Sequence, residues 1–405
     1  MLCVWFASRV LVLGISVLSG LGTQSDVFYY FDHINALGAS GPAQTMPEYP
    51  IPAVWLLAVP WLLGLGRSTG YVIAFACLML ALDAAFTYTL WRTGGRRRSQ
   101  AVLLWTVFLM LIGPTAYMRF DLIVSVMAGW ALLAMRRRRP GIAGALIGVG
   151  AAVKLWPALL WPALCGLGRR TAVRATAAFG VVGLVAAGAA WAWAGWDRLV
   201  SPLVYQSDRG LQIESVFASV PMLLRGLGLG DFAVTLSRYQ AFEIWGTGVQ
   251  LWLRAASVAV YLGYGLILVA YAAWLWRGHG RLDEAAVLVL LAITTLIVTN
   301  KTFSPQYVIW LGAPLAAAVI IIGDGRPRLR RLCVLVLAMT LATLLVYPLG
   351  YTTLVRDAAG WTQVARGAVT VVLVARNAML VWIEIQLIRW AYGFLKPGTE
   401  REVLA

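Results

Sequence analysis

The chain has 405 residues, of which 61% are hydrophobic and 12% are charged, and its mean hydropathy is +0.79. This composition excludes a soluble domain of this length and indicates a polytopic membrane protein. The net charge of +16 comes from short basic clusters between apolar runs, so we expect membrane lipids rather than nucleic acid as partners.

Apolar runs recur along the chain at lengths that predict membrane-crossing helices rather than the short alternating strands of a barrel. We therefore predict an all-α fold, a polytopic integral membrane helical bundle forming a single domain over residues 1–405. The first run lacks a cleavage site and is interpreted as a retained helix. About twelve spans are expected, at residues 4–21, 68–91, 101–114, 121–135, 141–153, 155–168, 175–194, 250–276, 284–299, 306–322, 332–349 and 366–390.

The basic clusters set the predicted orientation. Most Arg and Lys residues, such as Arg96–Arg98 and Arg136–Arg139, fall on the side of the spans that holds both termini. The positive-inside rule makes that side cytoplasmic. Because heavy use of Arg, Ala and Gly is typical of a GC-rich bacterium, we expect a bacterial plasma membrane.

Three polar segments then face outward, and these are where we expect the site. They are residues 22–50, 195–249 and 300–306. The apolar segment 51–65 that follows the first of them is placed as an outer interfacial helix. The outer loops about 22–67 and 195–249 are therefore expected to carry most of the chemistry.

The first outer loop contains a carboxylate close to the membrane boundary. In a short helix capped by Ser25, Asp26, Tyr29, Tyr30 and His33 share one face, whereas Asp32 lies about 120° away from Asp26. Asp26 is thus a candidate for proton chemistry, with local capping of the helix as the simpler alternative. His33 is more often an interfacial polar residue than a base.

The outer cations are candidates for binding an anion. The short spans 141–153 and 155–168 meet near Lys154, and broken helices are tolerated only beside protein or a water-filled cavity. Lys301 also sits where an apolar run breaks. Each lysine alone is equally well explained as a snorkelling anchor, but two of them, with Arg209, favour a phosphate headgroup.

Five short motifs in outer segments occur in an order that resembles glycosyltransferase family 87 of the C superfamily. Members of that family are polyprenol-phosphate-mannose-dependent α-mannosyltransferases. The resemblance covers most of the chain, although the family usually shows Tyr-Pro-Pro where this chain has Tyr-Pro-Ile-Pro. The motifs are Asp26 with Tyr29-Tyr30, Tyr49-Pro50-Ile51-Pro52, the stretch from Gly148 to Ala158 around Lys154, the stretch from Asp208 to Ser215, and Asn300 to Tyr307 running into Trp310 and Pro314.

The resemblance implies a C-superfamily fold and an inverting sugar transfer at the outer face. Asp26 would be the catalytic base, and the donor would be a polyprenyl-phosphate sugar, such as polyprenyl-phosphate mannose. The acceptor would be a hydroxyl of a glycolipid or glycan. Lys154, Lys301 and Arg209 would hold the donor phosphate, and no metal or other cofactor is expected. The candidates for positioning substrate are Tyr29, Tyr30, His33, Glu48, Tyr49, Glu214 and Gln306.

A multi-pass transporter is the main alternative from another class, because the twelve predicted spans have both ends on one side and Gly94-Gly95 precedes Arg96–Arg98. The absence of two similar halves argues against it. A lipid-linked glycan flippase or a ligase is a third possibility. Among charges inside the spans, Asp83 and Arg376 are too costly to face lipid, and we predict that they can pair between helices.

Overall fold

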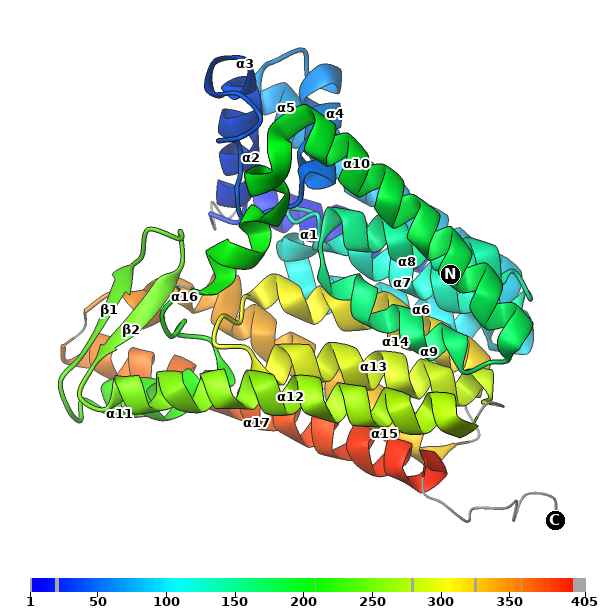
Figure 1. Cartoon of the computed structure of the whole chain (residues 1–405). Helices are drawn as coiled ribbons and strands as arrows, with labels where there is room; N and C mark the ends of the chain where they lie inside the picture. Colours follow the sequence, from blue (N-terminus) through cyan, green and yellow to red (C-terminus); the bar gives the residue numbers. More distant parts are fainter. Residues whose placement is uncertain are drawn as a thin grey trace.

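The computed structural model describes residues 2–18, 22–207, 209–277, 280–323, 326–357 and 359–395. Helices make up most of this part of the chain, so the all-α prediction is confirmed with one exception (Figure 1). The exception is an antiparallel hairpin in the predicted outer loop 195–249. Its strands β1 (Phe232–Leu236) and β2 (Phe242–Gly246) pair in a register that runs from Phe232 opposite Gly246 to Leu236 opposite Phe242.

The helices of the first half, with short 3₁₀ segments labelled η, are α1 (Leu2–Leu18), α2 (Ser25–Asn35), α3 (Leu37–Ser40), α4 (Ile51–Leu63), α5 (Ser68–Thr93), η1 (Gly95–Arg97), α6 (Arg98–Ile112), η2 (Gly113–Ala116), α7 (Asp121–Arg136), α8 (Pro140–Val153), η3 (Trp156–Leu160), α9 (Trp161–Cys165) and α10 (Arg169–Ser207). A kink at Gly195, which has a φ of 82°, divides α10 into a long apolar part and a short terminal part.

The second half contains η4 (Val216–Ala218), α11 (Ser219–Gly226), α12 (Val249–Arg277), α13 (Leu282–Thr299), η5 (Pro305–Val308), α14 (Ile309–Ile322), α15 (Pro327–Leu344), η6 (Leu345–Leu349), α16 (Tyr351–Val355) and α17 (Trp361–Leu395). The η6 segment is a π-helical turn that is interrupted by the extended backbone of Tyr347.

Eight helical segments in the described ranges are long and apolar enough to cross a bilayer. The remaining predicted spans correspond to shorter apolar helices, among them α1 and α8, or to α7, which has 16 residues. The expected number of twelve crossings therefore stays a prediction. The segments that meet the length criterion are Ser68–Thr93, Gly95–Ala116, Arg169–Ala194, Val249–Arg277, Leu282–Thr299, Pro305–Ile322, Pro327–Leu349 and Trp361–Leu395.

The basic loops of the bundle lie together at one end. Arg97 donates to the carbonyl of Ile320 (3.1 Å), and Arg136 donates to the carbonyl of Thr93 (2.5 Å). Arg277 reaches the carbonyl of Phe394 near the end of α17. The first two contacts join three loops, and the third joins a fourth loop to the end of α17; the sequence assigns all of them to the cytoplasmic side.

The polar outer segments lie together at the opposite end. Arg119 donates to the carbonyl of Thr23 (3.0 Å), and Arg198 donates to that of Thr45 (3.0 Å). The backbone N–H of Gln212 donates to the carbonyl of Lys301 (3.1 Å). The three segments expected to carry the site are thus connected to the bundle and to each other.

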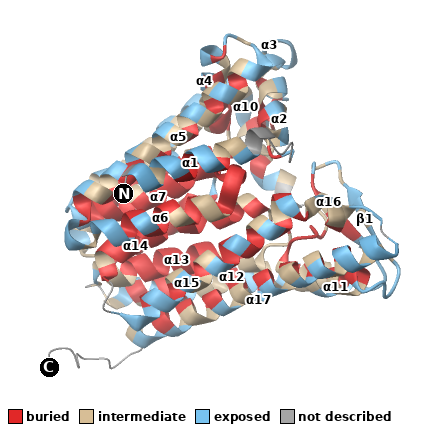
Figure 2. Ribbon diagram, turned by 180° about the vertical axis from the view of Figure 1, so that it is seen from behind, coloured by how far each residue is buried: buried red, intermediate tan, exposed pale blue. Residues whose placement is uncertain are grey.

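The core lies around α14, which packs against α6, α7 and α13 (Figure 2). Small residues allow the closest helix contacts. Gly144 of α8 faces α10, and a Cβ added there would lie 2.0 Å from the carbonyl oxygen of Ala175. The α8–α10 packing therefore depends on the absence of a side chain at position 144.

Buried charges pair inside the bundle, but not as predicted. Asp83 pairs with Arg9 of α1 (2.8 Å) and also accepts from Trp105 and Tyr117 (2.7 and 2.9 Å). Arg376 pairs instead with Glu214 (2.6 Å). The predicted Asp83–Arg376 pair is wrong, because α1 supplies the cation for Asp83 and an outer loop supplies the carboxylate for Arg376.

Gly144→Ala is expected to destabilise the protein by about 1–3 kcal/mol, because the new methyl group overlaps the backbone of Ala175 and forces α8 away from α10. Thermal unfolding in detergent measures the effect. Gly141→Ala in the same helix is the matched control, since a Cβ there meets nothing within 4 Å. Equal unfolding temperatures for the two variants would contradict the close approach.

Candidate active site

Asp26 lies in the first turn of α2, at the end of the bundle that the sequence predicts to face outward. The helix has Gln24 rather than Ser25 at its N-cap, and Asp26, Tyr29 and His33 follow one another along one face as predicted. The rings of Tyr29 and His33 lie 4.1 Å apart, and Nδ1 of His33 lies 2.9 Å from the carbonyl oxygen of Tyr29. The Asp26 side chain is 35% exposed, so a substrate can reach it.

The partner of Asp26 is Arg119, from the turn before α7. Nε of Arg119 lies 2.7 Å from Oδ2 of Asp26, and the arginine is 5% exposed. Its other nitrogens donate to the carbonyls of Thr23 and Met118 and to the hydroxyl of Tyr347 (3.0, 2.9 and 3.2 Å). Burial lowers the pKa of Arg119, but the charge of Asp26 outweighs it and holds the pKa above its usual value. Arg119 is a fixed cation that orients the carboxylate.

Lys154 lies at the break between α8 and η3, where the sequence predicts that two short helices meet. Its backbone is extended, and its Nζ lies 2.6 Å from Oδ1 of Asp121. Asp121 is 1% exposed and also accepts from Nε1 of Trp310 (2.5 Å). The lysine is 16% exposed and keeps N–H donors beyond the one that Asp121 accepts.

Aromatic rings surround the Lys154 ammonium. Its Nζ lies 5.2 Å from the ring centroid of Phe120, 5.3 Å from that of Trp310 and 5.4 Å from that of Tyr307. Trp310 stacks between Trp156 and Tyr307, with centroid distances of 4.8 and 4.2 Å. These rings limit water access to Lys154 and stabilise its charge through cation–π contacts.

Both ion pairs start from one tripeptide, Arg119-Phe120-Asp121. Arg119 binds Asp26, and Asp121 binds Lys154. The ring of Phe120 contacts the rings of Tyr30 and Tyr49 at centroid distances of 5.6 and 5.0 Å, and Nζ of Lys154 lies 5.2 Å from its centroid. The tripeptide therefore links the Asp26 carboxylate to the Lys154 cation.

The predicted positioning tyrosines of the first loop differ in exposure. The Tyr29 hydroxyl donates to Oε1 of Glu48 (2.6 Å), and burial together with that carboxylate raises the pKa of Tyr29. Burial likewise raises the pKa of Tyr30 and Tyr49. All three hydroxyls stay protonated at neutral pH. Tyr29 and Glu48 are partly exposed, whereas Tyr30 is buried (1% exposed).

Three other predicted site residues, Arg209, Glu214 and Lys301, belong to a second group near the hairpin. Residues 209–215 run beside β2 and bond through Gln212 to Lys301. The Arg209 guanidinium lies 5.8 Å from the ring centroid of Tyr239, and Gln306 accepts from the hydroxyl of Ser304 (2.5 Å). Asp208, which belongs to the same motif, lies outside the described residues.

Glu214 is fully buried, and its carboxylate and carbonyl accept from Arg376 (both 2.6 Å). Burial raises the pKa of Glu214, and Arg376 opposes that effect. The residue has no exposed surface, so we assign it to anchoring the loop that carries Arg209. Its predicted contact with substrate stays a prediction.

Sequence reasoning missed the roles of Arg119, Asp121 and Trp310. The signal available was the pair of opposite charges at 119 and 121 at an outer membrane edge, but their partners lie far away in the chain. In the described ranges, no group of three or more His, Cys, Asp or Glu side chains is close enough to hold a metal ion.

Lys154→Met is expected to destabilise the protein by about 3–5 kcal/mol, because it leaves the buried Asp121 carboxylate without a cation. The double variant Lys154→Met/Asp121→Leu is expected to recover most of this loss, since it removes both charges. Thermal unfolding followed by tryptophan fluorescence measures both. Arg281→Met, which breaks an exposed pair with Asp283, is the control and should cost less than about 1 kcal/mol. A single Lys154 variant as stable as this control would refute the pairing.

Comparison with known proteins found a match to the family model of glycosyltransferase family 87 over residues 48–299. The matched range includes Lys154, Arg119 and Asp121, whereas Asp26 and Lys301 lie outside it. No curated protein and no solved structure matches the chain. Because the family model covers more than half of the sequence, the chain belongs to glycosyltransferase family 87 and is a glycosyltransferase.

Proposed function

We propose that this glycosyltransferase moves a sugar from a polyprenyl-phosphate donor to a hydroxyl of a cell-envelope glycolipid or glycan. The observation that carries the proposal is the partly exposed Asp26 carboxylate, which is held by Arg119, while Asp121 of the same tripeptide holds Lys154. The family match favours this function over a transporter, a flippase or a ligase. Mannose as the sugar rests on the sequence resemblance.

Asp26 acts as the general base of an inverting displacement. Its carboxylate takes the proton of the acceptor hydroxyl while the acceptor oxygen forms a bond to the anomeric carbon. The bond between that carbon and the phosphate oxygen breaks, and the electron pair leaves with the phosphate. Because a phosphate departs as an anion without being protonated, one carboxylate suffices, whereas ordinary glycoside hydrolysis needs two.

The donor phosphate binds to the cations Lys154, Lys301 and Arg209. Lys154 has N–H donors left after pairing with Asp121, and its aromatic surroundings keep the local dielectric constant low. Lys301 and Arg209 belong to the second group, where the backbone N–H of Gln212 donates to the carbonyl of Lys301. A preorganised donor aimed at developing charge contributes about 2.7–4 kcal/mol to transition-state stabilisation.

The reaction takes place at the outer face of a bacterial plasma membrane, with both termini in the cytoplasm. The support is the separation of the molecule into two ends, one gathering the basic loops and the other holding Asp26, Lys154 and Lys301. Positive loops face the cytoplasm in most membrane proteins. A lipid-linked donor suits the outer face, because nucleotide sugars are absent there.

Asp26→Asn is expected to lower transfer by a factor of about 10²–10⁴, because the amide keeps the shape of the carboxylate but cannot take a proton. The assay uses full-length protein in nanodiscs, radiolabelled polyprenyl-phosphate mannose and a cell-envelope glycolipid extract. Asp32→Asn is the matched control, since Asp32 is an exposed carboxylate of the same helix, and it should retain wild-type activity.

Unchanged transfer in Asp26→Asn would refute the base assignment. A wild-type protein that transfers no sugar from any polyprenyl-phosphate donor, yet catalyses transfer from a nucleotide sugar, would refute the donor class.

A further inference from the structure

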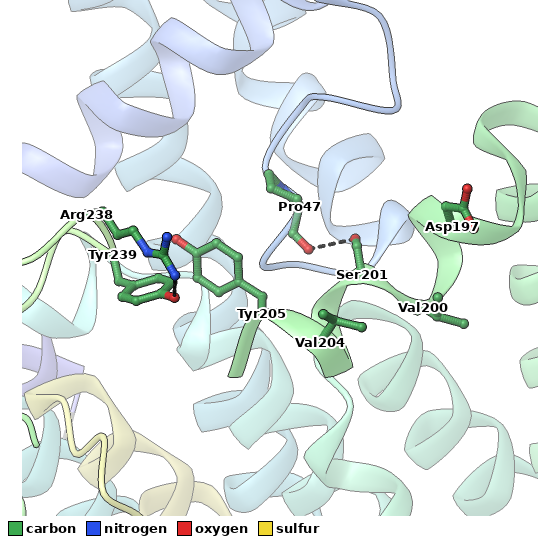
Figure 3. A pocket seen from close by; sticks show the side chains of 8 residues that line it. All are labelled: Pro47, Asp197, Val200, Ser201, Val204, Tyr205, Arg238 and Tyr239. Carbon is green, nitrogen blue, oxygen red and sulfur yellow. Dashed lines mark hydrogen bonds between the residues drawn. The ribbon is translucent and has the colours of Figure 1, made fainter. Parts of the chain in front are cut away.

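A cavity of about 580 Å³ opens between the terminal part of α10 and the turn of the hairpin (Figure 3). Tyr205, Arg238 and Tyr239 gather at one end of it, Asp197 lies at the other, and Pro47 and Ser201 lie between them. The volume falls within the range of about 300–1,000 Å³ that is usual for ligand pockets. None of the predicted site residues lines it.

The walls of the cavity are linked to Asp26, the proposed general base. Ser201 donates to the carbonyl of Pro47 (2.8 Å), and the neighbouring Glu48 accepts from Tyr29 (2.6 Å). Tyr29 lies one helical turn after Asp26. On the opposite wall, Tyr239 contacts Arg209 of the second group. The cavity is therefore connected to Asp26 through Pro47, Glu48 and Tyr29, and Lys154 is not among its lining residues.

The lining suits a neutral polyol better than a hydrocarbon or an anion. The rings of Tyr205 and Tyr239 meet edge to face with centroids 5.0 Å apart, and Arg238 donates to the Tyr239 hydroxyl (2.6 Å), which fixes this wall. A hydrocarbon chain would desolvate Arg238 and Asp197 without compensation. The lining holds one cation, Arg238, and one carboxylate, Asp197, so its charged side chains sum to zero.

A sugar ring offers hydroxyl groups to the charged side chains and C–H faces to the aromatic rings. We propose that this cavity binds the sugar unit of the acceptor that carries or adjoins the attacking hydroxyl. The assignment rests on the proposed function. In an inverting displacement the attacking hydroxyl and the leaving phosphate lie on opposite faces of the anomeric carbon, and the cavity is lined by other residues than the cation Lys154.

The test measures KM separately for the two substrates, with the nanodisc protein, the labelled donor and the glycolipid extract. Tyr205→Ala and Tyr239→Ala are expected to raise the apparent KM for the extract about tenfold and to leave the donor KM unchanged. Tyr205→Phe keeps the ring and should behave like wild type. Arg238→Ala, at an exposed position, should raise the same KM without affecting folding.

Tyr261→Ala is the matched control, because Tyr261 is a 77% exposed tyrosine of α12 away from the cavity. An unchanged KM for the extract in the cavity variants would overturn this inference while leaving the proposed function intact. A rise in the donor KM instead would assign the cavity to the donor and also overturn it. A wild-type protein inactive with every polyprenyl-phosphate donor would overturn the proposed function itself.

Discussion

Two ion pairs that start from one tripeptide organise this site. Arg119 holds Asp26 at 2.7 Å, and Asp121 holds Lys154 at 2.6 Å. Three separate elements depend on this arrangement: α2, which presents Asp26, the break after α8, which presents Lys154, and the start of α14, where Trp310 also binds Asp121. A buried charge without a partner costs several kcal/mol, so the pairs fix these elements together.

The need to pair buried charges also explains how the outer loops attach to a bundle whose interior is apolar. Arg376 binds Glu214 inside the protein, and this anchors the loop that carries Arg209. Arg198 donates to the carbonyls of Thr45, Met46 and Tyr49, so the terminal part of α10 is held on the loop that carries Glu48. Arginine suits this task because its planar fork satisfies several oxygen atoms at once. The cavity thus lies between two anchored walls.

Local patterns in the sequence predict the elements of the site better than its contacts. The face shared by Asp26, Tyr29 and His33 and the helix break at Lys154 follow from helical periodicity and from apolar runs that end early. The partner of Asp26 does not follow, because Arg119 lies more than 90 positions later and nothing local distinguishes Asp26 from Asp121 as its partner. The Asp83–Arg376 prediction failed for the same reason. The hairpin was missed because its strands are short and lie in a polar outer segment, where apolar runs give no signal.

In the proposed mechanism a single carboxylate, Asp26, drives an inverting displacement of a lipid phosphate. The anomeric configuration of the product distinguishes this mechanism from a double displacement. With a β-linked polyprenyl-phosphate mannose as donor, the one-bond carbon–proton coupling at the anomeric carbon is measured by NMR in the purified product. A single displacement gives an α-linked mannoside. A β-linked product would require two successive displacements and a second nucleophile, and it would contradict the role of Asp26 as the only reacting carboxylate.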